Sequence, residues 1–82
     1  MPRVADEYLV HLLLEGGHRE EVRFGSIQEF QKWYQGELLA QMGSNELVNV
    51  PVRGLQGEFL VLRPSKLVAI RVEPVFLSSI ER

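Results

Sequence analysis

The sequence of 82 residues contains no cysteine, which excludes disulfide bonds, thiolate metal ligands and cysteine nucleophiles. No apolar run approaches the roughly 18 residues of a membrane-spanning helix, because stretches such as Phe59–Leu62 are only strand-sized. Residues 1–7 also lack the apolar stretch of a signal peptide. We therefore expect a cytoplasmic protein.

The sequence also lacks a marked excess of positive or negative charge. The net charge is −2, which is too small to steer the protein towards one class of partner. Residues 1–46 carry four basic and eight acidic side chains, whereas residues 47–82 carry five basic and three acidic ones. A chain of this length has room for one small domain. We expect residues 1–82 to form it, with residues 1–6 and 75–82 as less ordered or docking tails.

Two apolar-rich runs around a Gly-Gly pair predict a β-hairpin. A three-residue loop, Gly16–His18, would pair Leu12 with Val22 and place Glu15 opposite Arg19 as a cross-strand ion pair. Loops of two or four residues would set charged side chains against the apolar row, so the three-residue loop is favoured. The buried face of this hairpin then holds Tyr8, Val10, Leu12, Leu14, Val22 and Phe24.

The segment after the hairpin has the pattern of a capping box, in which Ser26 caps the Glu29 amide and the Glu29 carboxylate bonds the Ser26 amide. Apolar spacings of three and four then predict an amphipathic helix over about 26–42. Gly36 costs this helix about 1 kcal/mol relative to alanine, and Gly43 stands where a left-handed C-terminal cap belongs. Trp33 flanks the apolar stripe, which is formed by Ile27, Phe30, Tyr34, Leu38 and Met42.

Three further strands are predicted, over residues 46–53, 58–63 and 67–73. Pro51 indicates an edge strand because proline has no N–H to donate, and Pro74 is expected to end the last strand. The apolar faces hold Val48, Val50 and Val52 in the first of these strands and Val68, Ile70 and Val72 in the last.

The predicted order is β-β-α-β-β-β, an α+β fold. One twisted, mainly antiparallel sheet with the helix packed across it would bury every apolar row. The segment Phe59–Pro74, two strands around a Pro-Ser break, resembles the end of small SH3-like and Sm-like barrels. That pattern is generic to hairpins and the central helix departs from those barrels, so the resemblance assigns no functional residue.

Side chains that could carry catalysis are few and poorly spaced. His11 and His18 are the only imidazoles, and no H-x-H, H-x-x-x-H or H-E-x-x-H spacing indicates a metal site. Ser26 is assigned to the helix cap, whereas the neighbours Ser65 and Lys66 would point to opposite faces of a strand. We therefore expect no enzymatic activity, no metal, no cofactor and no small-molecule substrate.

The apolar residues exceed what one small core is expected to cover, and such an excess marks a homodimer interface or a partner surface. The sequence therefore predicts a non-catalytic binding or scaffolding protein that acts through another protein or through itself. Aromatic and large aliphatic side chains are the usual anchors of such interfaces. The predicted partner-binding residues are Trp33, Phe76, Leu77 and Ile80.

A weak nucleic-acid-binding domain is the alternative interpretation. Basic side chains gather in the C-terminal β region, where they could contact phosphates in a salt-dependent way. The acidic overall balance and the lack of a stacking aromatic pair on a strand weigh against it. The residues that would carry this function are Arg53, Arg63, Lys66 and Arg71.

Overall fold

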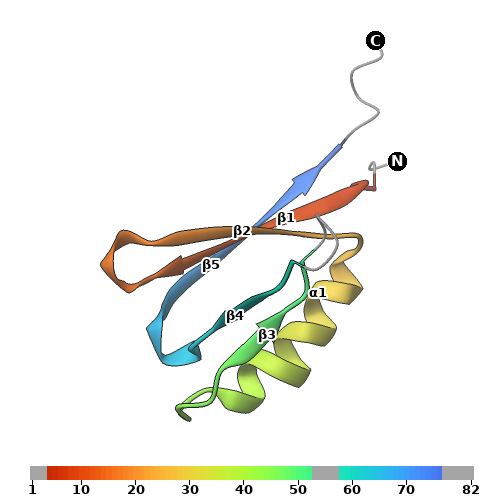
Figure 1. Ribbon diagram of the computed structural model, residues 1–82. Coiled ribbons are helices and arrows are strands. Elements are labelled where there is room, and N and C mark those ends of the chain that lie inside the picture. Colours follow the sequence, from red (N-terminus) through yellow and green to blue (C-terminus); the bar gives the residue numbers. More distant parts are fainter. Residues whose placement is uncertain (1–3, 53–57, 77–82) are drawn as a thin grey trace.

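The computed structural model describes residues 4–52 and 58–76 and confirms an α+β domain with the predicted element order (Figure 1). A π-helical turn, Tyr34–Leu38, and a 3-10 turn, Leu39–Gln41, continue α1 without a break in the chain direction. The strands and the α-helix are β1 Glu7–Leu14, β2 Arg19–Phe24, α1 Ile27–Trp33, β3 Val48–Val50, β4 Leu60–Leu62 and β5 Leu67–Val75.

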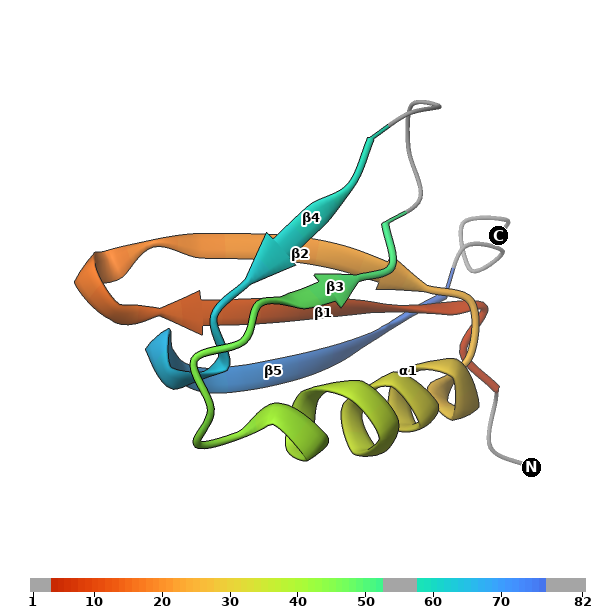
Figure 2. The same ribbon diagram turned by 60° about the horizontal axis from the view of Figure 1, so that its bottom comes forward.

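The strands form two antiparallel sheets where one was predicted. The first has the order β2-β1-β5, with β1 in the centre, and the second is the β3-β4 ribbon. Pro51 follows β3 and Pro64 lies shortly after β4, so each short strand ends where a ladder donor is missing. Both α1 and the ribbon lie on the same side of the three-stranded sheet (Figures 1 and 2). The molecule therefore has two layers, with the core between them.

The hairpin buries the predicted face but in a different register. Leu12 lies opposite Glu20 and Val10 opposite Val22, so each pairing is displaced by two residues and the side-chain faces are unchanged. The loop is Glu15–Gly17, because Gly16 and Gly17 both adopt positive φ and the chain has already reversed at Gly17. The predicted ion pair between Glu15 and Arg19 is therefore wrong.

The helix begins as predicted, and its second half is wound differently. Ser26 Oγ accepts a hydrogen bond from the Glu29 N–H at 3.1 Å, and the Glu29 carboxylate accepts one from the Gly25 N–H, one residue before the predicted donor. In the π-helical turn, the Leu39 N–H bonds Tyr34 O, five residues back. This wider turn brings Trp33 and Leu38, five residues apart, onto the core face. The predicted stripe is therefore confirmed as far as Leu38, which is fully buried, and it fails only at Met42, which is exposed.

The core lies between the sheet and the second layer. Val10 and Leu12 on β1 are completely buried, and Trp33 retains 6% of its exposed area. Phe24 packs edge-on against Phe30, with ring centroids 5.5 Å apart, which joins β2 to α1. The buried apolar residues are Val10, Leu12, Val22, Phe24, Phe30, Trp33, Leu38, Val48, Val50 and Leu62.

Strand β5 departs from its predicted faces and from its predicted end. Leu13 pairs with Ala69 and Leu14 with Leu67, so Val68 is an extra, bulged residue and is exposed rather than buried. The strand also continues through Pro74, which lies opposite Tyr8. Proline is tolerated there because β5 is the edge of its sheet, where an outward-facing N–H has no ladder partner.

The glycine in the π-helical turn gives a test of this helix. No heavy atom lies within 4 Å of a Cβ placed on Gly36, and its φ is not positive. We expect Gly36→Ala to raise the free energy of unfolding by about 0.5–1 kcal/mol, because alanine loses less backbone entropy on folding. Urea unfolding measures the change. Gly43→Ala is the matched control, and it should destabilise because Gly43 has a φ of 87°. A loss of stability in Gly36→Ala would contradict the helical geometry described for Gly36.

Candidate functional site

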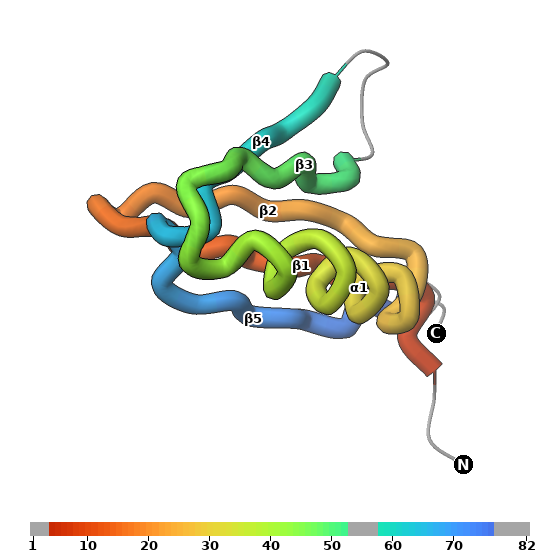
Figure 3. The backbone as a smooth tube through the Cα atoms, turned by 90° about the horizontal axis from the view of Figure 1, so that it is seen from below, coloured from red at the N-terminus to blue at the C-terminus, as the bar shows by residue number. Residues whose placement is uncertain are grey.

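Strand β5 is one of the two edge strands of the three-stranded sheet, and β2 is the other. Within the described residues β5 pairs with β1 on one side and with no strand on the other, and it forms the margin of the molecule in Figure 3. Pro74 has no N–H, so it fits a position whose N–H would point away from β1. Ile70 and Val72 are an even number of residues away from Pro74 along the strand, so their N–H and C=O groups also face the open side.

An apolar groove runs beside this edge, between β5 and the helix. Its volume is about 400 Å³, which is within the size range of ligand pockets. Phe30 and Tyr34 stack with ring centroids 5.6 Å apart and supply its helical wall. Two of its residues are well exposed, Val68 at 67% and Met42 at 47%. The groove is lined by Phe30, Tyr34, Met42, Leu67, Val68, Ala69, Ile70 and Val72.

The sequence pattern does not reveal this groove, because it assigns both exposed residues to the core. Met42 falls on the predicted helical stripe, but the helical turns end at Gln41 and Met42 is extended. Val68 falls on the predicted apolar face of β5, but the bulge leaves it exposed. Pro74 is the sequence signal that points to the edge, since proline within a strand indicates an unpaired side.

Trp33 lies in the core rather than on a partner surface. Its indole N–H donates a 2.8 Å hydrogen bond to the backbone oxygen of Asn49, which ties the helix to β3. It also forms part of the floor of a second pocket, of about 440 Å³, on the side of the helix facing Arg23 and Pro51. Its burial leaves little of the ring for a partner to contact.

Of the other predicted partner residues, Phe76 lies within the described part of the chain. Phe76 directly follows β5 and is half-buried. Leu77 and Ile80 lie outside the described residues. The predicted tail is wrong at its first residue, since Val75 belongs to β5 and its oxygen accepts a 2.8 Å hydrogen bond from the Asp6 N–H.

The described basic residues of the nucleic-acid interpretation make different side-chain contacts. Arg63 donates to Asn45 O at 3.1 Å, in the segment after the helix. Lys66 lies 3.6 Å from the Glu15 carboxylate in the hairpin loop. Arg71 lies on the outer face of β5, opposite His11 on β1. Arg53 lies outside the described residues. Arg63 and Lys66 lie at the two ends of one 3-10 turn, where the Lys66 N–H donates a 2.9 Å hydrogen bond to Arg63 O, and Arg71 lies further along the chain, on β5.

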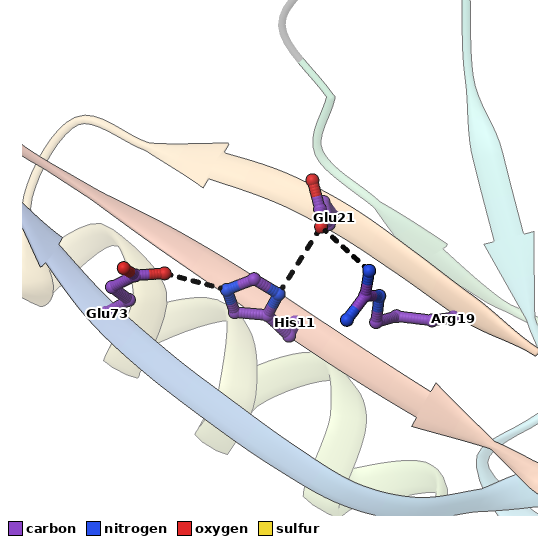
Figure 4. A network of polar contacts seen from close by, with 4 residues as sticks. All are labelled: His11, Arg19, Glu21 and Glu73. Atoms are coloured by element: carbon purple, nitrogen blue, oxygen red, sulfur yellow. Dashed lines mark hydrogen bonds and ion pairs between the residues drawn. The ribbon is translucent and has the colours of Figure 1, made fainter.

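The outer face of the sheet carries a chain of polar contacts centred on His11 (Figure 4). His11 Nε2 lies 3.0 Å from Glu73 Oε1 on β5, and Nδ1 lies 3.6 Å from Glu21 Oε2 on β2. Arg19 approaches the same Glu21 oxygen at 3.6 Å. His11 therefore links all three strands through their side chains, on the face that points away from the core.

Glu73 is the described group with a clearly altered acidity. The hydrogen bond from His11 holds the pKa of the Glu73 carboxyl below its usual value, and the charge of Arg71 acts in the same direction against the effect of desolvation. Since the folded state favours the carboxylate, the Glu73–His11 contact stabilises the fold above the usual pKa. That contribution is lost as the pH falls through the lowered pKa.

The remaining histidine makes a local contact. His18 Nε2 lies 2.7 Å from Glu20 Oε2, and both side chains are at the exposed end of the hairpin. Across residues 4–52 and 58–76, no group of three or more His, Cys, Asp or Glu side chains is arranged to hold a metal ion.

Comparison of the chain with protein-family models, curated proteins and solved structures gives no match. Among the described residues, no helix is long and apolar enough to cross a membrane. The candidate site is therefore argued from its own geometry.

The Glu73–His11 contact predicts a pH-dependent difference in stability. We expect Glu73→Gln to be less stable than the wild type near neutral pH, with the difference shrinking as the pH falls below 4.5, where the wild-type carboxyl takes up its proton. Urea unfolding at a series of pH values measures it, with Glu37→Gln as a control at an exposed carboxylate away from His11. A difference that stays constant with pH would contradict the assignment.

Because Trp33 is buried, its substitution is expected to change the stability of the fold. We expect Trp33→Phe to lower the free energy of unfolding by about 2 kcal/mol, because it removes buried volume and leaves Asn49 O without its indole donor. Urea unfolding measures the loss, and Tyr34→Phe, which keeps the ring, should cost less. An unchanged stability in Trp33→Phe would show that the ring is not a core element.

Proposed function

We propose that the protein is a non-catalytic protein-interaction module that binds an extended segment of a partner along β5. The observation that carries the proposal is the open β5 edge lying directly beside an apolar groove. Peptides that add a strand to a sheet edge gain affinity from main-chain hydrogen bonds and specificity from pockets for alternate side chains. This arrangement supplies both elements.

The backbone part of the site is the regular section of β5 after the bulge. Ile70 and Val72 present their N–H and C=O groups to the open side, by the parity set by Pro74. Nothing in the described part of the chain pairs with these groups as a neighbouring strand. A partner strand would extend the sheet by one ladder, and the β1–β5 pairing would hold the edge in place.

The side-chain part of the site is the groove against the helix. Every second residue of an added strand points to the helical side of the sheet, where the Phe30–Tyr34 wall stands. Apolar side chains at those positions would cover Val68 and Met42, whose exposure is otherwise unfavourable. We therefore expect partners with alternating apolar residues and no bulky charge facing the groove.

Selection from a library of random peptides displayed against the full-length protein tests this function. We expect enriched peptides to show alternating apolar residues and to shift the amide resonances of residues 67–73 and 75. Val68→Lys should weaken their binding by about tenfold or more, because a charge on the edge and in an apolar groove opposes strand addition.

The matched control is Val61→Lys, since Val61 is also an exposed valine in a strand but lies on β4, in the other sheet. We expect it to leave peptide binding unchanged. Peptides that bind Val68→Lys as well as the wild type, or that shift amides around the Trp33 pocket instead, would contradict the proposal.

A further inference from the structure

We infer that the segment that binds β5 is β5 of a second copy of this chain, paired antiparallel about a two-fold axis through Val72. The inference rests on the proposed function, because it uses the same edge and groove. The paired copies would form one continuous sheet with the strand order β2-β1-β5-β5-β1-β2. A self-complementary edge of this kind gives a closed dimer rather than an open fibre.

The backbone groups fit this register. Val72 directs its N–H and C=O away from β1, so two copies of Val72 facing each other would exchange both hydrogen bonds. The Ile70 N–H of each copy would reach the Pro74 C=O of the other. The missing N–H of Pro74 costs one bond at each end and leaves no buried donor unsatisfied, since proline has none.

The charges on the outer face select this register among the alternatives. With Val72 on the axis, Arg71 of one copy lies directly opposite Glu73 of the other, twice in the dimer, and opposite charges at directly facing positions stabilise a sheet. An axis through Arg71 would set two arginines against each other. An axis through Ile70 would place Arg71 opposite Ala69 and form no ion pair.

Arg71 and Glu73 can both form this ion pair without losing a contact described in the single chain. Within the described residues, the Arg71 guanidinium makes no ion pair. Glu73 uses Oε1 for His11, which leaves Oε2 for the guanidinium of the second copy. Glu73 is a carboxylate at neutral pH, because the ordinary pKa of a glutamate lies well below 7.

The groove would be covered by the same contact. Because both helices lie on the same face of the joined sheet, the Ile70 and Val72 side chains of the two copies would face one another at the floor of a shared apolar space. Val68 and Met42, exposed in the single chain, would lie at its rim. One contact would thus pair the open edge of β5, cover the groove and bring the opposite charges together.

The register is tested by reversing one charge in one copy and the opposite charge in the other copy. Arg71→Glu alone sets the introduced carboxylate against Glu73, and Glu73→Arg alone sets two guanidinium groups against each other, so each should weaken self-association by about tenfold or more. An equimolar mixture of the two variants recreates both opposite-charge pairs and should dimerise as well as the wild type. Sedimentation equilibrium from micromolar to millimolar protein measures this, with amide spectra confirming that each variant is folded.

Arg23→Glu is the matched control, because Arg23 is an exposed strand arginine on β2, the opposite edge of the sheet, and its partner Glu7 lies outside the His11 network; it should leave dimerisation unchanged. A wild type that stays monomeric at millimolar concentration, or a mixture that associates no better than its components, would overturn the inference. If displayed peptides still bind β5 in that case, the proposed function stands and only the identity of the partner is wrong.

Discussion

The structure depends on β1 being paired along both of its edges. β1 joins β2 on one side, through a short local turn, and β5 on the other, through residues about sixty positions away in the chain. An isolated two-stranded hairpin is marginally stable, so β5 turns the hairpin into a sheet that can support a core. Val10 and Leu12 are fully buried because of this central place. Occupation of both sides of β1 also leaves β5 as an edge.

The π-helical turn and the end of the helix determine which side chains of the second layer face the core and which line the groove. It rotates Leu38 onto the same face as Trp33, whose indole N–H binds the backbone of β3, and the helical turns then end before Met42. Phe30 and Tyr34 remain as a stacked wall over β5. The Trp33 hydrogen bond therefore fastens the helix to the ribbon, and the end of the helical turns at Gln41 leaves Met42 extended beside the groove. Gly36 lies in the π-helical turn, where its low helix propensity favours irregular winding.

A site of the proposed kind accounts for the lack of a functional motif in the sequence. Its main recognition elements are backbone N–H and C=O groups, which nearly every residue carries, and an apolar groove made by residues from two distant segments. The polar chemistry is on the opposite face, where His11 holds Glu73 and Glu21 in place. In the proposed dimer that face would position the charges of β5 and so contribute specificity.

The sequence by itself determined the α+β class, the element order, the Ser26 cap, the left-handed Gly43 and the buried face of the hairpin, because each follows from local spacing or from the chemistry of one residue. It could not determine the hairpin register, since a displacement of two residues keeps every side chain on its face. It also could not determine the bulge at Val68, the passage of β5 through Pro74 or the burial of Trp33. Those were decided by tertiary structure, because each depends on which segment lies alongside: β1 beside β5, and β3 beside the helix.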